Sequence, residues 1–161
     1  MAHIAETREL PWSVEQMYAL VADVKRYGEF LPWVVGTRIR SDDGAMMVAD
    51  MLVGFSGLRE KFTSRVNKAA PDAAGAAAIT VDYLDGPMRS LANSWRFAPT
   101  AAGGCRIDFV CDFTFRSALF EKIAGQYLDR AFRRMVAAFE TRAAQLYGAS
   151  GRNSSSATSA A

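Results

Sequence analysis

The sequence has little of the chemistry on which most catalytic and metal sites depend. Its 161 residues include a single histidine, His3, close to the N-terminus. Serine–histidine and cysteine–histidine catalysis need a positioned imidazole, and a multi-histidine zinc site needs several. We therefore expect a binding protein rather than an enzyme, with no catalytic residue, no metal and no required cofactor.

Cysteines and long apolar runs are also scarce. Cys105 and Cys111 lie in one alternating run, and in a strand they would stand roughly 20 Å apart. A disulfide needs Cα atoms within about 7 Å, so we expect two unpaired thiols, as in a reducing compartment. No signal-peptide pattern is present, and no apolar stretch approaches the roughly 20 residues of a membrane span. The predicted location is the cytoplasm, with at most peripheral contact with the inner membrane.

An excess of charge of one sign is missing too. The chain has 19 Lys+Arg against 17 Asp+Glu, and a net charge of +2 does not by itself indicate a nucleic-acid partner. Half of the residues are hydrophobic, which at this length predicts one folded domain. The last residues contain no large apolar side chain and cannot offset their ordering entropy. We predict a domain over residues 1–147 and a disordered tail over 148–161.

Local patterns predict the elements of this domain. Ser13 and Gln16 have the spacing of a capping box, which predicts a helix over 13–24. Apolar residues recur every three or four positions over 117–147, which predicts a long second helix. Apolar and polar residues alternate as in strands over 3–10, 35–40, 45–53, 58–66, 77–84, 91–97 and 105–116.

This order of elements predicts an α+β fold. We expect one antiparallel sheet of about six or seven strands, one or two short helices after the first strand, and a long C-terminal helix. A long antiparallel sheet twists and curves, so it can wrap around the helix. Where helix and sheet diverge, we expect an elongated apolar cavity, which is the usual form of a small-molecule site.

Short motifs along residues 3–147 carry a family resemblance. They include Tyr18-x-x-Val21-Ala22-Asp23-Val24, Tyr27-x-x-Phe30-Leu31-Pro32-Trp33, Phe62-Thr63-Ser64-Arg65-Val66, Gly86-Pro87, Trp95-x-Phe97 and Phe139-Glu140-x-Arg142-Ala143. In this order and spacing they resemble the coenzyme Q-binding branch of the START/polyketide cyclase superfamily, which has the helix-grip (START/Bet v-like) fold. Val34 and Met88 depart from the Cys and Phe usual in the family. Both positions stay apolar, so the departures bear on ligand shape more than on fold.

The resemblance implies non-catalytic binding of a hydrophobic ligand, first of all ubiquinone, in support of respiratory electron transport. Bacterial relatives are described as ribosome-association toxins, so inhibition of translation by blocking subunit association is the alternative. A cyclase/aromatase-like enzyme is a second alternative, whose chemistry here would fall to Glu60 and tyrosines. The expected partner is a polyprenyl quinone or another lipid. Peripheral membrane contact and contact with a ribosomal subunit are the further partners to consider.

Candidate ligand-binding residues lie on the inward faces of the predicted elements and in apolar loops. A quinone needs an apolar groove for its tail and a few directed donors for its head. Simple core packing is the alternative role for each aromatic candidate. The candidates are Phe30, Leu31, Trp33, Phe55, Glu60, Phe62, Ser64, Tyr83, Pro87, Met88, Leu91, Asn93, Trp95, Phe109, Phe113, Phe132, Met135 and Phe139.

Three polar residues interrupt these apolar faces. Glu60 and Ser64 share a face with Phe62, and Asn93 lies on the apolar face of a later strand. Burying a polar group without a partner is costly, so each of the three either joins an internal network or lines a cavity. Our hypothesis is that Asn93 or Tyr83 donates a hydrogen bond to a quinone-like carbonyl.

Basic residues lie outside the predicted core, interspersed with acids, which is typical of solvated faces. If they cluster, they would suit anionic lipid headgroups or ribosomal RNA. They are Lys25, Arg26, Arg38, Arg40, Arg59, Lys61, Arg65, Lys68, Arg130, Arg133, Arg134 and Arg142.

Overall fold

A computed structural model describes residues 2–55 and 57–148, without the side chains of Ala2, Phe55, Leu58, Phe120 and residues 123–129. The predicted tail lies outside these residues, except for Gly148. The elements in chain order are β1 (Ala2–Leu10), α1 (Val14–Ala22), the 3-10 helix η1 (Val24–Glu29), β2 (Val34–Asp42), β3 (Met46–Phe55), β4 (Leu58–Ala69), β5 (Ala77–Asp85), β6 (Met88–Pro99), β7 (Cys105–Phe115) and α2 (Ala118–Tyr147).

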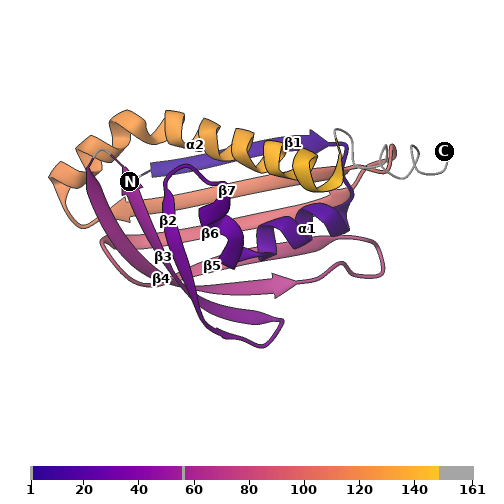
Figure 1. Cartoon of the computed structure of the whole chain (residues 1–161), viewed down its shortest axis with the longest axis horizontal. Coiled ribbons are helices and arrows are strands. Elements are labelled where there is room, and N and C mark those ends of the chain that lie inside the picture. The colour runs from indigo at the N-terminus through magenta and orange to yellow at the C-terminus, as the bar shows by residue number, and fades with distance from the viewer. Residues whose placement is uncertain (1, 56, 149–161) are drawn as a thin grey trace.

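The seven strands form one sheet in the order β1-β7-β6-β5-β4-β3-β2, and every neighbouring pair is antiparallel. Strands β2 to β7 therefore form a meander, and β1 adds to the edge of β7. Figure 1 shows the sheet curving around α2, with β2, β3 and β4 bending up toward the N-terminal half of that helix. The α+β helix-grip architecture predicted from the sequence is confirmed.

Local signals explain where the helices begin and end. The Ser13 hydroxyl accepts from the Gln16 backbone N–H at 3.1 Å, and the Gln16 side chain accepts from the Ser13 N–H at 2.9 Å. This is the predicted capping box, and it fixes the start of α1. At the other end of the chain, Gly148 has φ +92° and its N–H bonds to the Ala144 carbonyl, which closes α2.

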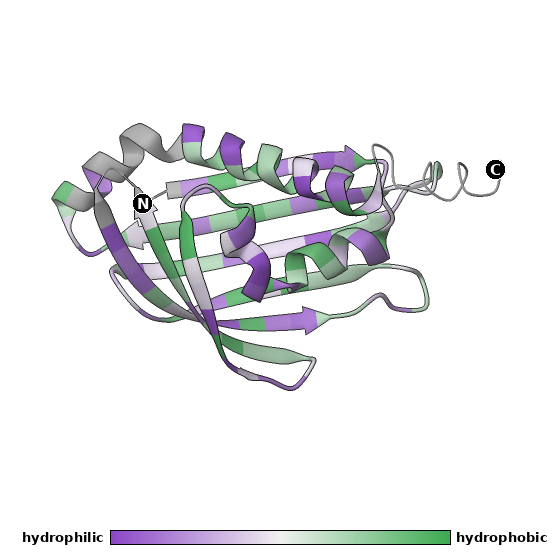
Figure 2. Cartoon of the chain, viewed as in Figure 1, coloured by the Kyte–Doolittle hydropathy of each residue, from purple (hydrophilic) through white to green (hydrophobic). Residues whose placement is uncertain are grey.

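The strands carry the alternation that their sequence predicts. Figure 2 shows hydrophilic and hydrophobic residues in bands along them. On β4, Phe62, Ser64 and Val66 face the concave side, and Arg65 lies on the convex side with an ion pair to Asp82. This period-two pattern gives the sheet one face for the interior and one for solvent.

The densely packed core lies where α1 fills the space between the sheet and the C-terminal half of α2. Its most buried residues include Met17 of α1, Ile79 and Phe97 of the sheet, and Ala143 of α2. Two polar bonds tie the chain ends to this core: Tyr147 Oη donates to the Gln16 carbonyl at 3.1 Å, and Trp12 Nε1 to the Gly148 carbonyl at 2.8 Å. This end of the molecule is therefore filled, and the donors of Trp12 and Tyr147 are paired there.

One buried polar cluster on the convex face was not predicted. Asp50 of β3 is only 5% exposed and accepts from the Thr63 hydroxyl at 2.6 Å and from Arg40 Nε at 2.9 Å. These hydrogen bonds, first of all that from Thr63, lower the pKa of Asp50. The cluster joins β2, β3 and β4 from the outside.

Candidate functional site

A cavity of about 610 Å³ lies between the concave face of the sheet, the α1–η1 segment and α2. This volume lies within the roughly 300–1,000 Å³ of typical small-molecule pockets. The lining is mostly apolar and comes from nearly every element. It consists of Val21, Val24, Tyr27, Leu31, Pro32, Trp33, Ala49, Met51, Val53, Gly54, Glu60, Phe62, Ser64, Val66, Ile79, Val81, Pro87, Met88, Leu91, Asn93, Trp95, Phe109, Cys111, Phe113, Phe115, Arg130, Ala131, Arg134, Met135 and Phe139.

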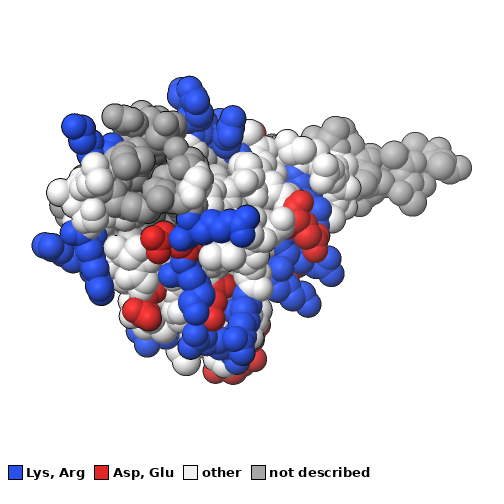
Figure 3. Space-filling model, turned by 60° about the vertical axis from the view of Figure 1, so that its left-hand side comes forward, with Lys and Arg blue, Asp and Glu red and all other residues white. Residues whose placement is uncertain are grey.

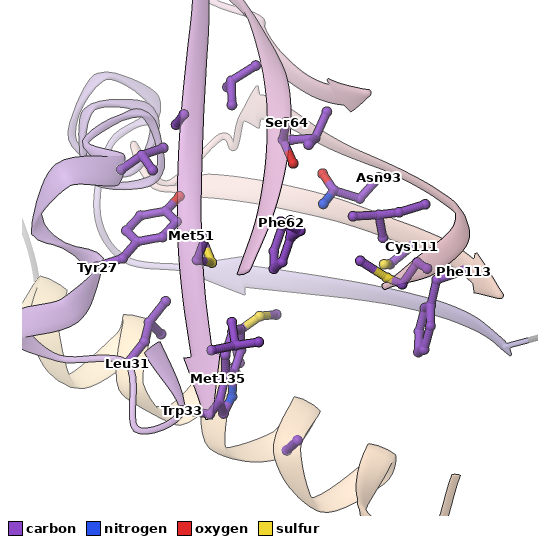
Figure 4. A pocket seen from close by; sticks show the side chains of 18 of the residues that line it. Tyr27, Leu31, Trp33, Met51, Phe62, Ser64, Asn93, Cys111, Phe113 and Met135 are labelled. Atoms are coloured by element: carbon purple, nitrogen blue, oxygen red, sulfur yellow. The ribbon is translucent and has the colours of Figure 1, made fainter. Parts of the chain in front are cut away.

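Most of the predicted site residues meet at this cavity. Figure 4 shows Ser64 and Asn93 on one side of the hollow, and Trp33 and Met135 on the other. The predicted residues in the lining are Leu31, Trp33, Glu60, Phe62, Ser64, Pro87, Met88, Leu91, Asn93, Trp95, Phe109, Phe113, Met135 and Phe139. Their role in binding stays a prediction, and the structure shows only that they line one cavity.

Two predicted residues pack beside the cavity instead of lining it. The Phe30 ring meets the rings of Tyr27 and Phe139 edge-on, at 6.0 and 5.3 Å between centroids. The Phe132 ring stacks on the Phe109 ring at 5.6 Å between centroids. Both aromatic residues support side chains that line the cavity. A further predicted residue, Phe55, lies outside the described side chains.

Tyr83 supports the turn between β5 and β6 and is not part of the lining. Its hydroxyl accepts from the Met88 backbone N–H at 3.0 Å. The turn passes so close that a Cβ on Gly86 would stand 2.6 Å from Cβ of Phe62 and 2.8 Å from the Tyr83 hydroxyl, and Gly86 has φ +146°. Glycine is therefore required there. Of the two donors in our hypothesis, only Asn93 lines the cavity.

The cavity wall holds polar atoms without partners. Among the described residues, four buried side-chain atoms lack a hydrogen bond: Trp33 Nε1, Ser64 Oγ, Asn93 Oδ1 and Arg142 Nε. The first three belong to lining residues. An unpaired buried polar group costs roughly 1–3 kcal/mol, so a ligand that pairs with these atoms recovers that cost.

Sequence reasoning missed several lining residues, above all the two arginines. Arg130 and Arg134 lie one turn apart on α2, are exposed, and border the cavity together with Met135. Helical periodicity in the sequence shows which residues share one face of the helix. It does not show where the helix moves away from the sheet and opens a cavity. Cys111 was predicted only to be an unpaired thiol. In the structure it lies directly opposite Asn93 on the neighbouring strand and also lines the cavity.

Burial controls the chemistry of two lining groups. Desolvation, followed by the nearby Asp112, raises the pKa of the Cys111 thiol to about 12. Burial likewise raises the pKa of Tyr27, whose hydroxyl donates to the Val21 carbonyl. Both groups are therefore protonated at neutral pH, and Glu60 is the one carboxylate among the lining residues that the structure describes.

The fold and sequence match known proteins along most of the chain. The family model described as "Polyketide cyclase / dehydrase and lipid transport" matches residues 10–140. The chain is 36% identical over 149 residues to "Ribosome association toxin RatA" of Escherichia coli (strain K12), covering 92% of this chain and 91% of the relative. It is 32% identical over 148 residues to "Coenzyme Q-binding protein COQ10 homolog B, mitochondrial" of Xenopus laevis, covering 89% of this chain and 59% of that one.

Solved structures give the same result for the fold. The solution structure of an 18 kDa protein from Caulobacter crescentus has a TM-score of 0.71 at 40% identity and covers 92% of this chain and 99% of its own. The Zhui aromatase/cyclase from Streptomyces sp. R1128 has a TM-score of 0.75 at 18% identity, with 93% and 98% covered. At that identity the aromatase/cyclase bears on the fold alone. Within the described residues, no helix has the length and apolarity needed to cross a bilayer.

Proposed function

Because this chain belongs to the polyketide cyclase/dehydrase and lipid transport family, we propose that it binds a polyprenyl quinone, specifically ubiquinone, and releases it unchanged. The quinone would occupy the cavity between the sheet and α2, and the protein would present it to respiratory enzymes. The observation that carries this proposal is an apolar cavity whose wall holds the unpaired polar atoms Ser64 Oγ and Asn93 Oδ1.

The cavity suits both parts of such a ligand. Each CH₂ of an isoprenoid tail buried against the apolar lining contributes about 0.8 kcal/mol. The Ser64 hydroxyl and the Asn93 amide each offer a donor and an acceptor, so they can pair with a carbonyl or a hydroxyl oxygen of the head. Head and tail therefore find matching groups within one cavity.

The lining also favours binding without reaction. The thiolate is the nucleophilic form of cysteine, and the Cys111 thiol, whose pKa is raised to about 12, is protonated at neutral pH. A quinone can therefore lie beside Cys111 without the sulfur adding to its ring. Glu60 alone offers a carboxylate for proton transfer among the described lining residues, and it has no hydrogen-bonded base or acid beside it in that part of the chain.

Extraction of the purified protein with organic solvent, followed by mass spectrometry, tests the proposal. We expect a polyprenyl quinone from the wild type and about tenfold less affinity for it in the Ser64→Ala/Asn93→Leu variant, which loses two hydrogen bonds at about 0.5–1.5 kcal/mol each. Lys25→Gln, an exposed change on η1, is the control. A lipid-free wild type, equal affinity in the double variant, or recovery of a chemically altered quinone contradicts the proposal.

A second candidate function is inhibition of translation through binding to a ribosomal subunit. Relatives from Escherichia coli and Rickettsia prowazekii, at 36% and 32% identity, are named ribosome association toxins. Arg38, Arg59 and Lys61 of the sheet are exposed and have no ion pair among the described residues, so they are available to RNA phosphates. Co-sedimentation with ribosomal subunits that weakens with added salt supports this function. A quinone-free protein that sediments with ribosomes would place it first.

A further inference from the structure

The cations around the cavity opening differ from those elsewhere on the molecule. Two arginines, Arg130 and Arg134, are exposed and line the cavity themselves. Arg59, Arg89 and Arg116 are exposed at the sheet edge where β4 and β6 begin and β7 ends, and Arg133 is exposed beside Arg134 on α2. Together we call these six residues the mouth arginines: Arg59, Arg89, Arg116, Arg130, Arg133 and Arg134.

None of the mouth arginines forms an ion pair with a described residue. Elsewhere the cations are mostly paired: Arg40 with Asp50 at 2.9 Å, Lys68 with Asp42 at 2.9 Å and Arg142 with Glu29 at 2.7 Å. Arg8, Arg26, Arg65 and Arg106 also have acidic partners. The mouth arginines therefore keep their charge available to an external anion.

Acidic residues at this end are fewer. The described ones include Glu60 in the lining, Asp85 before the β5–β6 turn and Glu121 in the first turn of α2, and Asp50 at the level of Asp85 is already paired with Arg40. Figure 3 turns this end toward the viewer and shows mostly Lys and Arg in its upper part, with Asp and Glu lower down among the cations of the sheet. The opening of the cavity is thus the basic end of a chain whose net charge is only +2.

Apolar side chains lie among these arginines. Leu119, in the first turn of α2, is 69% exposed, and Pro32 and Trp33 line the cavity. Basic groups around exposed apolar ones are the combination that binds anionic membrane surfaces. Each guanidinium also matches the geometry of a lipid phosphate.

We propose that the mouth arginines dock the protein on an anionic bilayer, with the cavity opening toward the lipid headgroups. The inference rests on the proposed function, because a quinone dissolved in a bilayer must pass through this opening to reach Ser64 and Asn93. Docking brings the opening to the ligand and the apolar groups Leu119 and Trp33 to the headgroup level. A bilayer suits this surface better than RNA because the arginines lie beside a mostly apolar cavity and the exposed side chain of Leu119.

Co-sedimentation of the full chain with phosphatidylcholine vesicles, with and without phosphatidylglycerol, tests the docking surface. We expect binding only with phosphatidylglycerol, weakening as salt is added. Each basic residue near such a surface contributes about a fivefold factor. Arg130→Gln/Arg134→Gln should therefore bind about 25-fold more weakly. The control Lys25→Gln/Arg96→Gln removes the same charge from exposed sites outside the mouth and should change binding less than about threefold.

Three outcomes overturn the inference: no binding to phosphatidylglycerol vesicles, equal loss in both double variants, or loss of ribosome binding in the mouth variant while vesicle binding persists. Unfolding midpoints of both variants show that the fold is intact. Measuring quinone content of the wild type in parallel separates the two proposals. A quinone-loaded protein that ignores anionic vesicles overturns the docking alone, and a quinone-free protein that binds them through Arg130 and Arg134 overturns the quinone proposal alone.

Discussion

The two halves of α2 meet the same sheet in different ways. In the C-terminal half, Phe139 is 5% exposed and Ala143 is fully buried. In the N-terminal half, Arg130 and Arg134 border an open cavity with Met135. The helix is continuous from Ala118 to Tyr147, so the difference comes from what fills the space beneath it.

What occupies the space beneath α2 also determines which polar groups have hydrogen-bond partners. At the core end, α1 occupies the space, and Trp12 Nε1 and Tyr147 Oη both reach backbone carbonyls. At the cavity end, Trp33 Nε1, Ser64 Oγ and Asn93 Oδ1 have no hydrogen-bond partner among the described residues. Folding alone pairs Trp12 and Tyr147 at the first end, whereas the second end is left with polar atoms in a cavity wall that suit a ligand.

The largest effect should come from removing an aromatic ring at the core end. Phe97 is 1% exposed, and Phe97→Ala should lower the free energy of unfolding by about 3–5 kcal/mol, because the truncation leaves a cavity. Phe62→Ala removes the same ring from the wall of an existing cavity and should cost about half of that or less. Urea unfolding measures both. Equal losses would show that the two ends are packed alike.

The next effect concerns the contact that fixes the C-terminal half of α2. Arg142 donates to Glu29 at 2.7 Å, and its guanidinium lies 5.3 Å from the centroid of the Phe30 ring. Arg142→Ala loses an ion pair between a largely buried arginine and a half-exposed glutamate, together with a cation–π contact, and should cost about 1–2 kcal/mol in thermal or urea unfolding. Arg133→Ala, an exposed change on the same helix, should stay within about 0.5 kcal/mol. A similar loss in both variants would contradict a specific role for Arg142.

Removal of a polar side chain from the cavity wall should raise the stability of the ligand-free protein instead of lowering it. Asn93→Leu removes an amide whose oxygen is unpaired, so the ligand-free protein should gain up to about 1 kcal/mol of stability while its affinity for quinone falls. Calorimetry of the delipidated protein and a quinone titration measure the two quantities. Loss of stability together with unchanged affinity would mean that Asn93 serves the fold.

The sequence predicts the fold well because its signals are local. The Ser13–Gln16 capping box and the strand alternation each act over a few residues, and together they place the elements in order. The strand ends were less exact: β6 begins at Met88 rather than near Leu91, because the tight turn at Gly86 lets pairing start earlier. Alternation also identified Ser64 and Asn93 as polar residues on apolar faces.

The site was harder to predict because a cavity depends on distances between elements. Phe30 and Phe132 carry the same apolar signal as Phe62, yet they pack behind the lining. Arg130 and Arg134 carry the signal of a solvated face and nevertheless border the cavity. Only the divergence of α2 from the sheet separates these cases, and no local pattern encodes it.

The smallest effect concerns the convex face of the sheet, opposite the cavity. There Asp50, Thr63 and Arg40 form a polar cluster that joins β2, β3 and β4. The pKa of Asp50 is lowered in the folded state, chiefly by the Thr63 hydroxyl and also by Arg40. A carboxyl with a lowered folded pKa adds stability above its unfolded pKa of about 3.9, and this stability is lost as the pH falls through the folded value. Because Arg40 is half exposed, we expect a contribution below about 1 kcal/mol.

Unfolding free energies at about pH 6 and about pH 3 measure this contribution, since these values lie on the two sides of the unfolded pKa. The wild type should lose more stability between them than Asp50→Asn, which has no carboxyl to titrate at that position. Thr63→Val keeps the carboxylate but removes its main donor, so its loss should be intermediate. The pKa of Asp42 is also lowered, by the Gly44 N–H and by Lys68. Because Asp42 is present in all three proteins, it contributes the same pH dependence of stability to each of them. If the wild type and Asp50→Asn lose the same unfolding free energy between these pH values, the Asp50 carboxylate does not stabilise the junction of β2, β3 and β4.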